Sequence, residues 1–180
     1  MLLKSTRVAF CGLAVGLSVA LMFLTGLIPI ATYALPALAG LPCIAVVVEM
    51  GARWAWPVYA AASILSIFLA GDKEAVALFI LFFGYYPILK SHLERFSSHV
   101  LSWVLKFAVF NAAMMLGYFA AVYLLGVPKD SFVVFGFFVP WLLLAAGNAV
   151  FFLYDYAVSG IVVAYYRRFH RAAAKWLRMK

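Results

Sequence analysis

Six long apolar segments, separated by short connections, dominate the chain. They lie near residues 8–28, 34–50, 54–70, 74–90, 102–125 and 137–166. A helix needs about 20 mostly apolar residues to span a bilayer, at about 1.5 Å of rise per residue. Since 68% of the residues are hydrophobic and 11% are charged, the chain has too little polar surface to cover a globule in water. We therefore expect an all-α polytopic membrane protein with a bundle of six transmembrane helices.

The basic residues predict the orientation of this bundle. If the N-terminus is cytoplasmic, all Lys and Arg residues except Lys73 and Lys129 fall on the cytoplasmic side, as the positive-inside rule requires. We expect a transmembrane domain over residues 1–166 of a plasma-membrane protein, with both termini cytoplasmic. The basic tail, 167–180, is expected to lie on the inner leaflet or to dock a cytosolic partner. The net charge of +8 fits anionic lipid, and no nucleic-acid partner is expected.

The second segment is interrupted by Pro36, Gly40 and Pro42. A broken helix is tolerated in a membrane only where protein or water satisfies the freed backbone groups. We therefore expect this segment inside the bundle, either lining a cavity or forming a packed kink.

Small residues recur at about four-residue spacing on the first helix, at Ala9, Gly12, Gly16 and Ala20. Such a face lets another helix approach closely, and close packing drives helix association in lipid. The face could pack within this chain's own bundle or dock a separate membrane subunit.

Asp155 is the most unusual residue, because it lies roughly 18 Å from the basic end of the last helix at about 1.5 Å per residue. A carboxylate at that depth should face the bundle interior and have a partner. No cation is expected at that depth, so we expect Asp155 to be protonated or hydrogen-bonded to groups such as Asn111 and Tyr154. Asn148 lies on the same helical face. The alternatives are a structural polar clasp, a solute-binding site and a proton-coupled switch.

No enzymatic constellation is recognised in the chain. The three histidines, His92, His99 and His170, lie in polar stretches outside the spans, and Asp155 is the single deep acid. We expect no catalytic residue, no metal site and no cofactor. Glu49 and Arg53, four residues apart, are expected to form a local ion pair.

The outer turns carry Tyr33, Asp72, Glu74 and Trp141. Asp72 is expected to cap the following helix, and Glu74 to complement its dipole. The aromatic residues are typical of an interfacial belt, and the alternative is the mouth of a substrate site.

In layout the chain resembles the substrate-binding S components of energy-coupling factor (ECF) vitamin transporters. The segment R-V-A-F-C-G-L-A-V-G-L-S-V-A-L, from Arg7 to Leu21, is similar to their first helix. The segment I-P-I-A-T-Y-A-L-P-A-L-A-G, from Ile28 to Gly40, is similar to their first outer loop and second helix.

This resemblance implies a six-helix subunit that captures a vitamin-like molecule and docks on a transmembrane T component driven by two cytosolic ATPases. It implies that Ala9, Gly12, Gly16 and Ala20 face the T component. The implied pocket residues are Tyr33, Glu74, Asn111, Trp141 and Asn148. We add Asp155 to these candidates because of its depth in the membrane.

Two other functions stay open from the sequence. One is a non-catalytic scaffold, similar to the small rod-shape-determining membrane proteins, which the apolar interior favours. The other is a stand-alone proton-linked carrier that works through Asp155.

Overall fold

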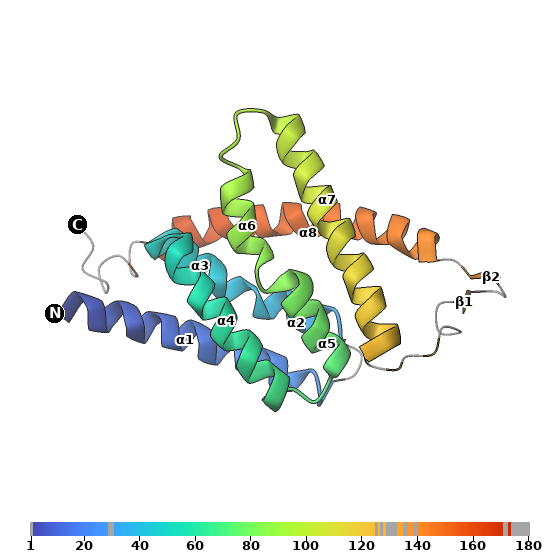
Figure 1. The fold of residues 1–180 in the computed structure, drawn as a ribbon. Coiled ribbons are helices and arrows are strands. Elements are labelled where there is room, and N and C mark those ends of the chain that lie inside the picture. Colours follow the sequence, from blue (N-terminus) through green and yellow to red (C-terminus); the bar gives the residue numbers. More distant parts are fainter. Residues whose placement is uncertain are drawn as a thin grey trace.

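The chain is a helical membrane protein in the computed structural model (Figure 1). The structure describes residues 2–28, 31–124, 126, 128, 133–134, 137–138, 140–170 and 173. Five helical stretches are long and apolar enough to cross a bilayer, namely Ser5–Leu24, Ala52–Leu69, Lys73–Leu93, His99–Leu124 and Leu144–Arg168. The shorter apolar stretch Ala34–Met50 corresponds to the second predicted segment. The predicted all-α, polytopic fold is confirmed.

The structure contains eight α-helices among the described residues. They are α1 (Leu2–Leu24), α2 (Ala34–Ala39), α3 (Leu41–Met50), α4 (Ala52–Leu69), α5 (Lys73–Leu78), α6 (Tyr86–Leu93), α7 (His99–Phe119) and α8 (Pro140–Arg168). Two π-helical stretches, Phe79–Phe83 and Ala120–Leu124, continue α5 and α7.

A small hairpin between α7 and α8 was not predicted from the sequence. Strands β1 (Val133–Val134) and β2 (Phe137–Phe138) pair antiparallel, with Val133 opposite Phe138. The last helix therefore begins at Pro140 and not at residue 137 as predicted. Continuous apolar residues are compatible with either a strand or a helix, and the hydropathy pattern does not separate them.

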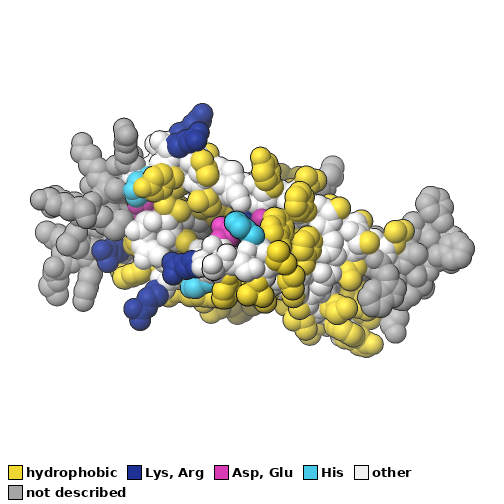
Figure 2. Space-filling view, turned by 90° about the horizontal axis from the view of Figure 1, so that it is seen from above, with side chains coloured by type: hydrophobic (Ala, Val, Ile, Leu, Met, Phe, Trp, Pro, Cys, Tyr) yellow, Lys and Arg dark blue, Asp and Glu magenta, His cyan; other side chains and the backbone are white. Residues whose placement is uncertain are grey.

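The beginning of α1 and the end of α8 lie at the same side of the molecule, which we call the basic end (Figure 1). In the space-filling view, the visible Lys and Arg side chains gather toward this end, while hydrophobic side chains cover much of the remaining described surface (Figure 2). Large apolar side chains such as Leu13, Phe68 and Leu153 are exposed on several helices. An apolar exterior of this kind matches hydrocarbon as the surrounding solvent.

At two helix breaks in the spans, a main-chain carbonyl accepts a hydrogen bond from a hydroxyl of a neighbouring helix. At the junction of α2 and α3, the Ser18 hydroxyl of α1 donates to the Ala39 carbonyl at 2.8 Å. At the π-helical stretch, the Tyr59 hydroxyl of α4 donates to the Ile80 carbonyl at 2.7 Å. These bonds replace partners that water cannot supply in hydrocarbon.

The two breaks also touch each other at Gly40. A Cβ atom on Gly40 would collide with the main-chain carbonyl of Phe83, so only glycine allows this approach. Of the two arrangements predicted for the broken segment, the packed kink is the one that the structure supports at this point.

The outer turn between α4 and α5 is held by Asp72, as predicted. Its Oδ1 accepts from the main-chain N–H groups of Glu74 and Ala75, at 2.9 and 3.0 Å. The Thr32 hydroxyl donates to Asp72 Oδ2 at 2.8 Å and so ties the loop after α1 to this turn. The N-terminus of the fourth span is therefore fixed by side-chain caps.

The small-residue face of α1 points away from the chain's own bundle. Ala9, Gly12, Gly16 and Ala20 are all exposed, and among the described residues no atom beyond the glycine's own stretch of helix lies within 4 Å of a Cβ placed on either glycine. The opposite face of α1 is the buried one, with Ala14, Ser18 and Met22. No described part of this chain packs against this face, and docking of a separate membrane subunit stays a prediction.

Replacing Gly40 with alanine should destabilise the protein by about 1–3 kcal/mol, because the added methyl group overpacks the contact with Phe83. Gly12→Ala is the matched control, since Gly12 is helical with open space around it. We expect the control to be neutral or slightly stabilising. Denaturant unfolding in detergent measures both, and equal stability of the two variants would contradict the packed kink.

A buried ion-pair cluster as the candidate functional site

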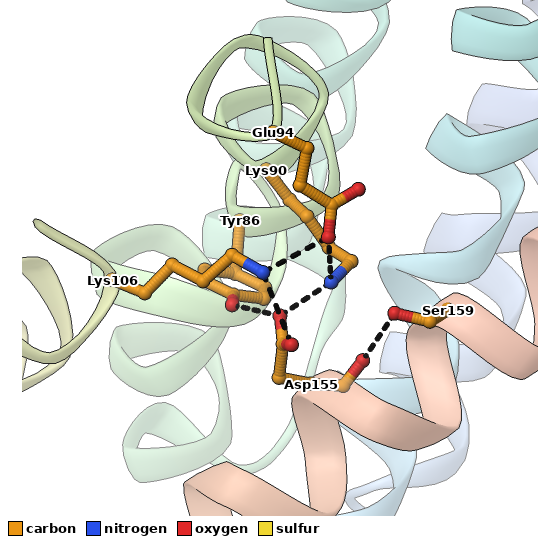
Figure 3. Close-up of polar contacts among 6 residues, drawn as sticks. All are labelled: Tyr86, Lys90, Glu94, Lys106, Asp155 and Ser159. Carbon is orange, nitrogen blue, oxygen red and sulfur yellow. Dashed lines mark hydrogen bonds and ion pairs between the residues drawn. The ribbon is translucent and has the colours of Figure 1, made fainter. Parts of the chain in front are cut away.

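Five polar side chains from three helices meet inside the bundle (Figure 3). Tyr86, Lys90 and Glu94 come from α6 and its end, where their four-residue spacing places them on one face. Lys106 comes from α7, and Asp155 comes from α8. We call these five residues the ion-pair cluster.

Asp155 uses both carboxylate oxygens within the cluster. Its Oδ1 accepts from the Tyr86 hydroxyl at 2.5 Å and from Lys90 Nζ at 2.6 Å. Its Oδ2 accepts from Lys106 Nζ at 3.1 Å. Asp155 therefore links α6 and α7 to α8 through charge-assisted bonds.

Glu94 closes the cluster at its solvent side. Its Oε1 lies 2.5 Å from Lys90 Nζ and 2.9 Å from Lys106 Nζ. The Glu94 side chain is 48% exposed, whereas the side chains of Lys90, Lys106 and Asp155 are each 4% exposed. Glu94 is thus the member of the cluster that water reaches.

The cluster is neutral when all four ionisable partners carry their charge, because two ammonium groups face two carboxylates. Burying a lone charge in hydrocarbon is expensive, and ionisable residues in membranes pair with one another. Breaking a buried pair costs more than the pair contributes, because it leaves an uncompensated charge. The arrangement is therefore stable only as a complete set.

Aromatic rings enclose the buried side of the cluster. Phe110 of α7 stacks on Phe151 of α8 with centroids 4.7 Å apart, and Phe151 also meets the Tyr86 ring edge-on at 5.4 Å. Lys106 Nζ lies 4.9 Å from the centre of the Trp103 ring, a cation–π contact. These rings keep the ion pairs away from lipid and water.

Glu94 lies just beyond the span and has a shifted pKa. Burial raises the pKa of its carboxyl group, but hydrogen bonds from Lys90 and Lys106 outweigh burial, and the pKa lies below its ordinary value. A lowered pKa contributes stability that is present above the unfolded-state pKa and lost as the pH falls through the folded-state pKa. The contribution of Glu94 to the cluster should therefore be lost in acid.

The expectation that no cation reaches Asp155 is wrong. Lys90 and Lys106 had been assigned to the cytoplasmic edge by their positions near a polar connector, but both are buried and contact Asp155. Their side chains extend from the helix ends toward the acid. The signal in the sequence is the four-residue spacing of Tyr86, Lys90 and Glu94, which places three polar side chains on one face of α6.

Asn111 and Asn148 pair with each other and not with Asp155. Two reciprocal amide hydrogen bonds join them, at 3.0 and 2.9 Å. The Tyr154 hydroxyl, the other expected partner of Asp155, is buried and has no hydrogen-bond partner among the described residues. The polar clasp predicted around Asp155 is thus two separate arrangements, the ion-pair cluster at Asp155 and the amide pair at Asn148, which lie at different positions along α8.

The other candidate residues lie toward the end opposite the basic end. Tyr33 is exposed just before α2, and Glu74 is exposed in the first turn of α5. No hydrogen bond or ion pair among the described residues joins either of them to the Asn111–Asn148 pair. Trp141 is in α8, but its side chain lies outside the described part of the chain.

The predicted ion pair between Glu49 and Arg53 does not form. Gly51, at φ 86°, ends α3 and separates the two residues onto different helices. The buried Glu49 carboxylate instead lies 3.1 Å from His170 Nδ1, beyond the end of α8. His170 was expected to be a surface group, and it is a partner of α3. Most of the basic tail lies outside the described residues.

A cavity of about 80 Å³ adjoins the cluster, between α3, α6 and α8. Its polar lining is Lys90, Ser91 and Glu94, and its remaining lining is apolar. Among the described residues, no three His, Cys, Asp or Glu side chains are grouped as metal ligands.

Asp155→Asn should destabilise the protein by about 3–5 kcal/mol, because it leaves two buried ammonium groups with one carboxylate. Adding Lys106→Met should recover part of the loss, since Lys90 and Glu94 then form a neutral pair. Ser159→Ala, one turn further along α8, is the control. Thermal unfolding in detergent tests this, and an Asp155→Asn variant as stable as the control would refute it.

Comparison with known proteins assigns no family to this fold. No family model matches the sequence, and no curated protein and no solved structure matches it. Helix length and hydropathy establish a polytopic helical membrane protein.

Proposed function

We propose that this protein is a non-catalytic membrane subunit that captures a small solute at the end opposite the basic end, as the resemblance to ECF S components implies. One observation carries the proposal. Among the described residues, the half of α7 and α8 near the ion-pair cluster contains buried side chains, and the other half contains none. The basic end is the predicted cytoplasmic side, so the less closed half faces outward.

The asymmetry follows from where the buried residues of α7 and α8 lie. On α7 they are Ser102, Lys106, Phe110 and Ala113. From Met114 to Leu124 no residue is buried. Among the described side chains of α8, the buried residues begin only at Phe151. A site that admits a solute requires such loosely packed walls, whereas the ion pairs exclude passage on the other side.

The Asn111–Asn148 pair lies at the boundary between the two halves. Both side chains are partly buried, and each also donates to its own helix, at Phe107 and Leu144 carbonyls. A few polar groups within apolar walls are typical of small-molecule sites. The amides are therefore the groups that we propose would contact a solute at its inner edge.

The exposed small face of α1 supports the second part of the proposal, docking on a transmembrane partner. Gly12 and Gly16 have open space around them, and Leu13 and Leu17 are exposed beside them. Close approach of another helix would bury this face. The proposed partner is a T component with its two cytosolic ATPases.

Native mass spectrometry of gently extracted protein tests solute capture. We expect one retained small molecule per chain, released on replacing both asparagines with leucine, because the pocket then loses its amides. Ser159→Ala is the control and should keep the solute. A protein that never carries a molecule, in membranes from cells importing vitamins, would exclude capture.

Co-purification with T component and ATPases tests docking. Gly12→Leu with Gly16→Leu should abolish association, because the added side chains hold the partner helix away. Gly160→Leu on α8 is the matched control, since Gly160 is also exposed with open space around it. Equal association of both variants would remove the α1 face from the proposal.

A non-catalytic scaffold is the second candidate, and the closed core favours it. Phe82, Tyr86 and Phe151 are nearly fully buried beside Asp155, and the adjoining cavity of about 80 Å³ is small for a vitamin. A scaffold should lose partner association in the α1 variant while never retaining a solute. For the carrier alternative, Asp155 already has two ammonium partners, which favours a structural role for this acid.

A further inference from the structure

The two buried lysines of the cluster share one oxygen on their solvent side. Asp155 offers each lysine its own oxygen, one to Lys90 and one to Lys106. Glu94 offers a single oxygen, Oε1, to both. The two ammonium groups thus form a seat for one negative charge, which Glu94 fills from its own helix.

Glu94 is the replaceable occupant of this seat. Its side chain is about half exposed, whereas the lysines and Asp155 are buried. The cavity of about 80 Å³ lies directly against Lys90 and Glu94, with the Ser91 side chain at its wall. The cavity therefore offers space beside Lys90 for a small ion that displaces the Glu94 carboxylate, whose Oε1 position lies within reach of both lysines.

We propose that Lys90 and Lys106 form a binding site for one small monovalent anion, chloride or a short carboxylate, which replaces the Glu94 carboxylate when Glu94 is protonated. One proton and one anion enter together. The cluster therefore stays neutral, and Asp155 keeps both lysines in place.

The surroundings of Glu94 determine when this exchange occurs. The charged or titratable groups near it are Lys90 and Tyr86 from α6, Lys106 from α7 and Asp155 from α8. At the shared cavity, α3 and α8 present apolar residues, namely Ile44, Val47, Val48, Val158 and Val162. No ion pair or hydrogen bond among the described residues joins Glu94 to α4.

The sign of the pH dependence follows from these neighbours. The lysines hold the pKa of Glu94 below its usual value, so the internal carboxylate fills the seat at neutral pH. Uptake of an external anion should begin as the pH falls through that pKa.

Thermal unfolding of the full chain in detergent tests the site, with sodium chloride replaced by sodium gluconate at constant ionic strength. Gluconate is too large for the cavity. At neutral pH, chloride should leave the wild type unchanged and stabilise Glu94→Ala in a saturable manner. The expected rise in Tm is roughly 2–4 °C at about five times the dissociation constant.

The control is the double variant Glu94→Ala with Lys106→Met, which is neutral without an external anion and should not respond to chloride. The wild type should become chloride-dependent only in acid, at a pH below the ordinary titration range of glutamic acid, because the lysines lower the pKa of Glu94. If Glu94→Ala does not accumulate, Glu94→Gln takes its place. The proposal would be overturned if chloride raised the Tm of neither Glu94→Ala nor Glu94→Gln. It would also be overturned if chloride raised the Tm of the double variant as much as that of the single variant.

Discussion

The ion pairs among Lys90, Lys106, Asp155 and Glu94 determine how α6, α7 and α8 pack against one another. Two ammonium groups cannot be buried in hydrocarbon without two carboxylates, and the carboxylates come from different helices. The helices are therefore assembled around a charge requirement as well as around apolar contacts. Phe110 and Phe151 complete the arrangement by shielding the acid that joins α8 to the other two helices.

A second constraint, the satisfaction of backbone groups, organises the other part of the bundle. The interruptions in the second and fourth spans free carbonyl groups that no water can reach. Ser18 and Tyr59 supply hydroxyl donors to them, and Gly40 lets the two interruptions lie against each other. The Ser18 and Tyr59 hydroxyls thus each join two helices at an interruption, where a buried carbonyl needs a donor.

Sequence periodicity and hydropathy were enough to predict the spans, the cap at Asp72 and the broken second segment, because these depend on local residues. They were not enough to find the partners of Asp155. The contacts between helices are a tertiary property that local sequence does not determine. From sequence alone, a lysine near a helix end is therefore interpreted as an interfacial residue. The same limit explains Glu49, whose partner His170 is distant in sequence. The exposure of the α1 small face was also undecidable from spacing alone.

The cluster also limits how the molecule could move. Pulling α8 away would carry off one negative charge and leave a positive one on α6 and α7, both facing hydrocarbon. Sliding of these three helices past one another is therefore opposed, and they should travel as one rigid body. Large displacements would then fall at the boundary with α1 to α4, where most contacts are apolar or single hydrogen bonds, and they would have to break the pair between Glu49 of α3 and His170.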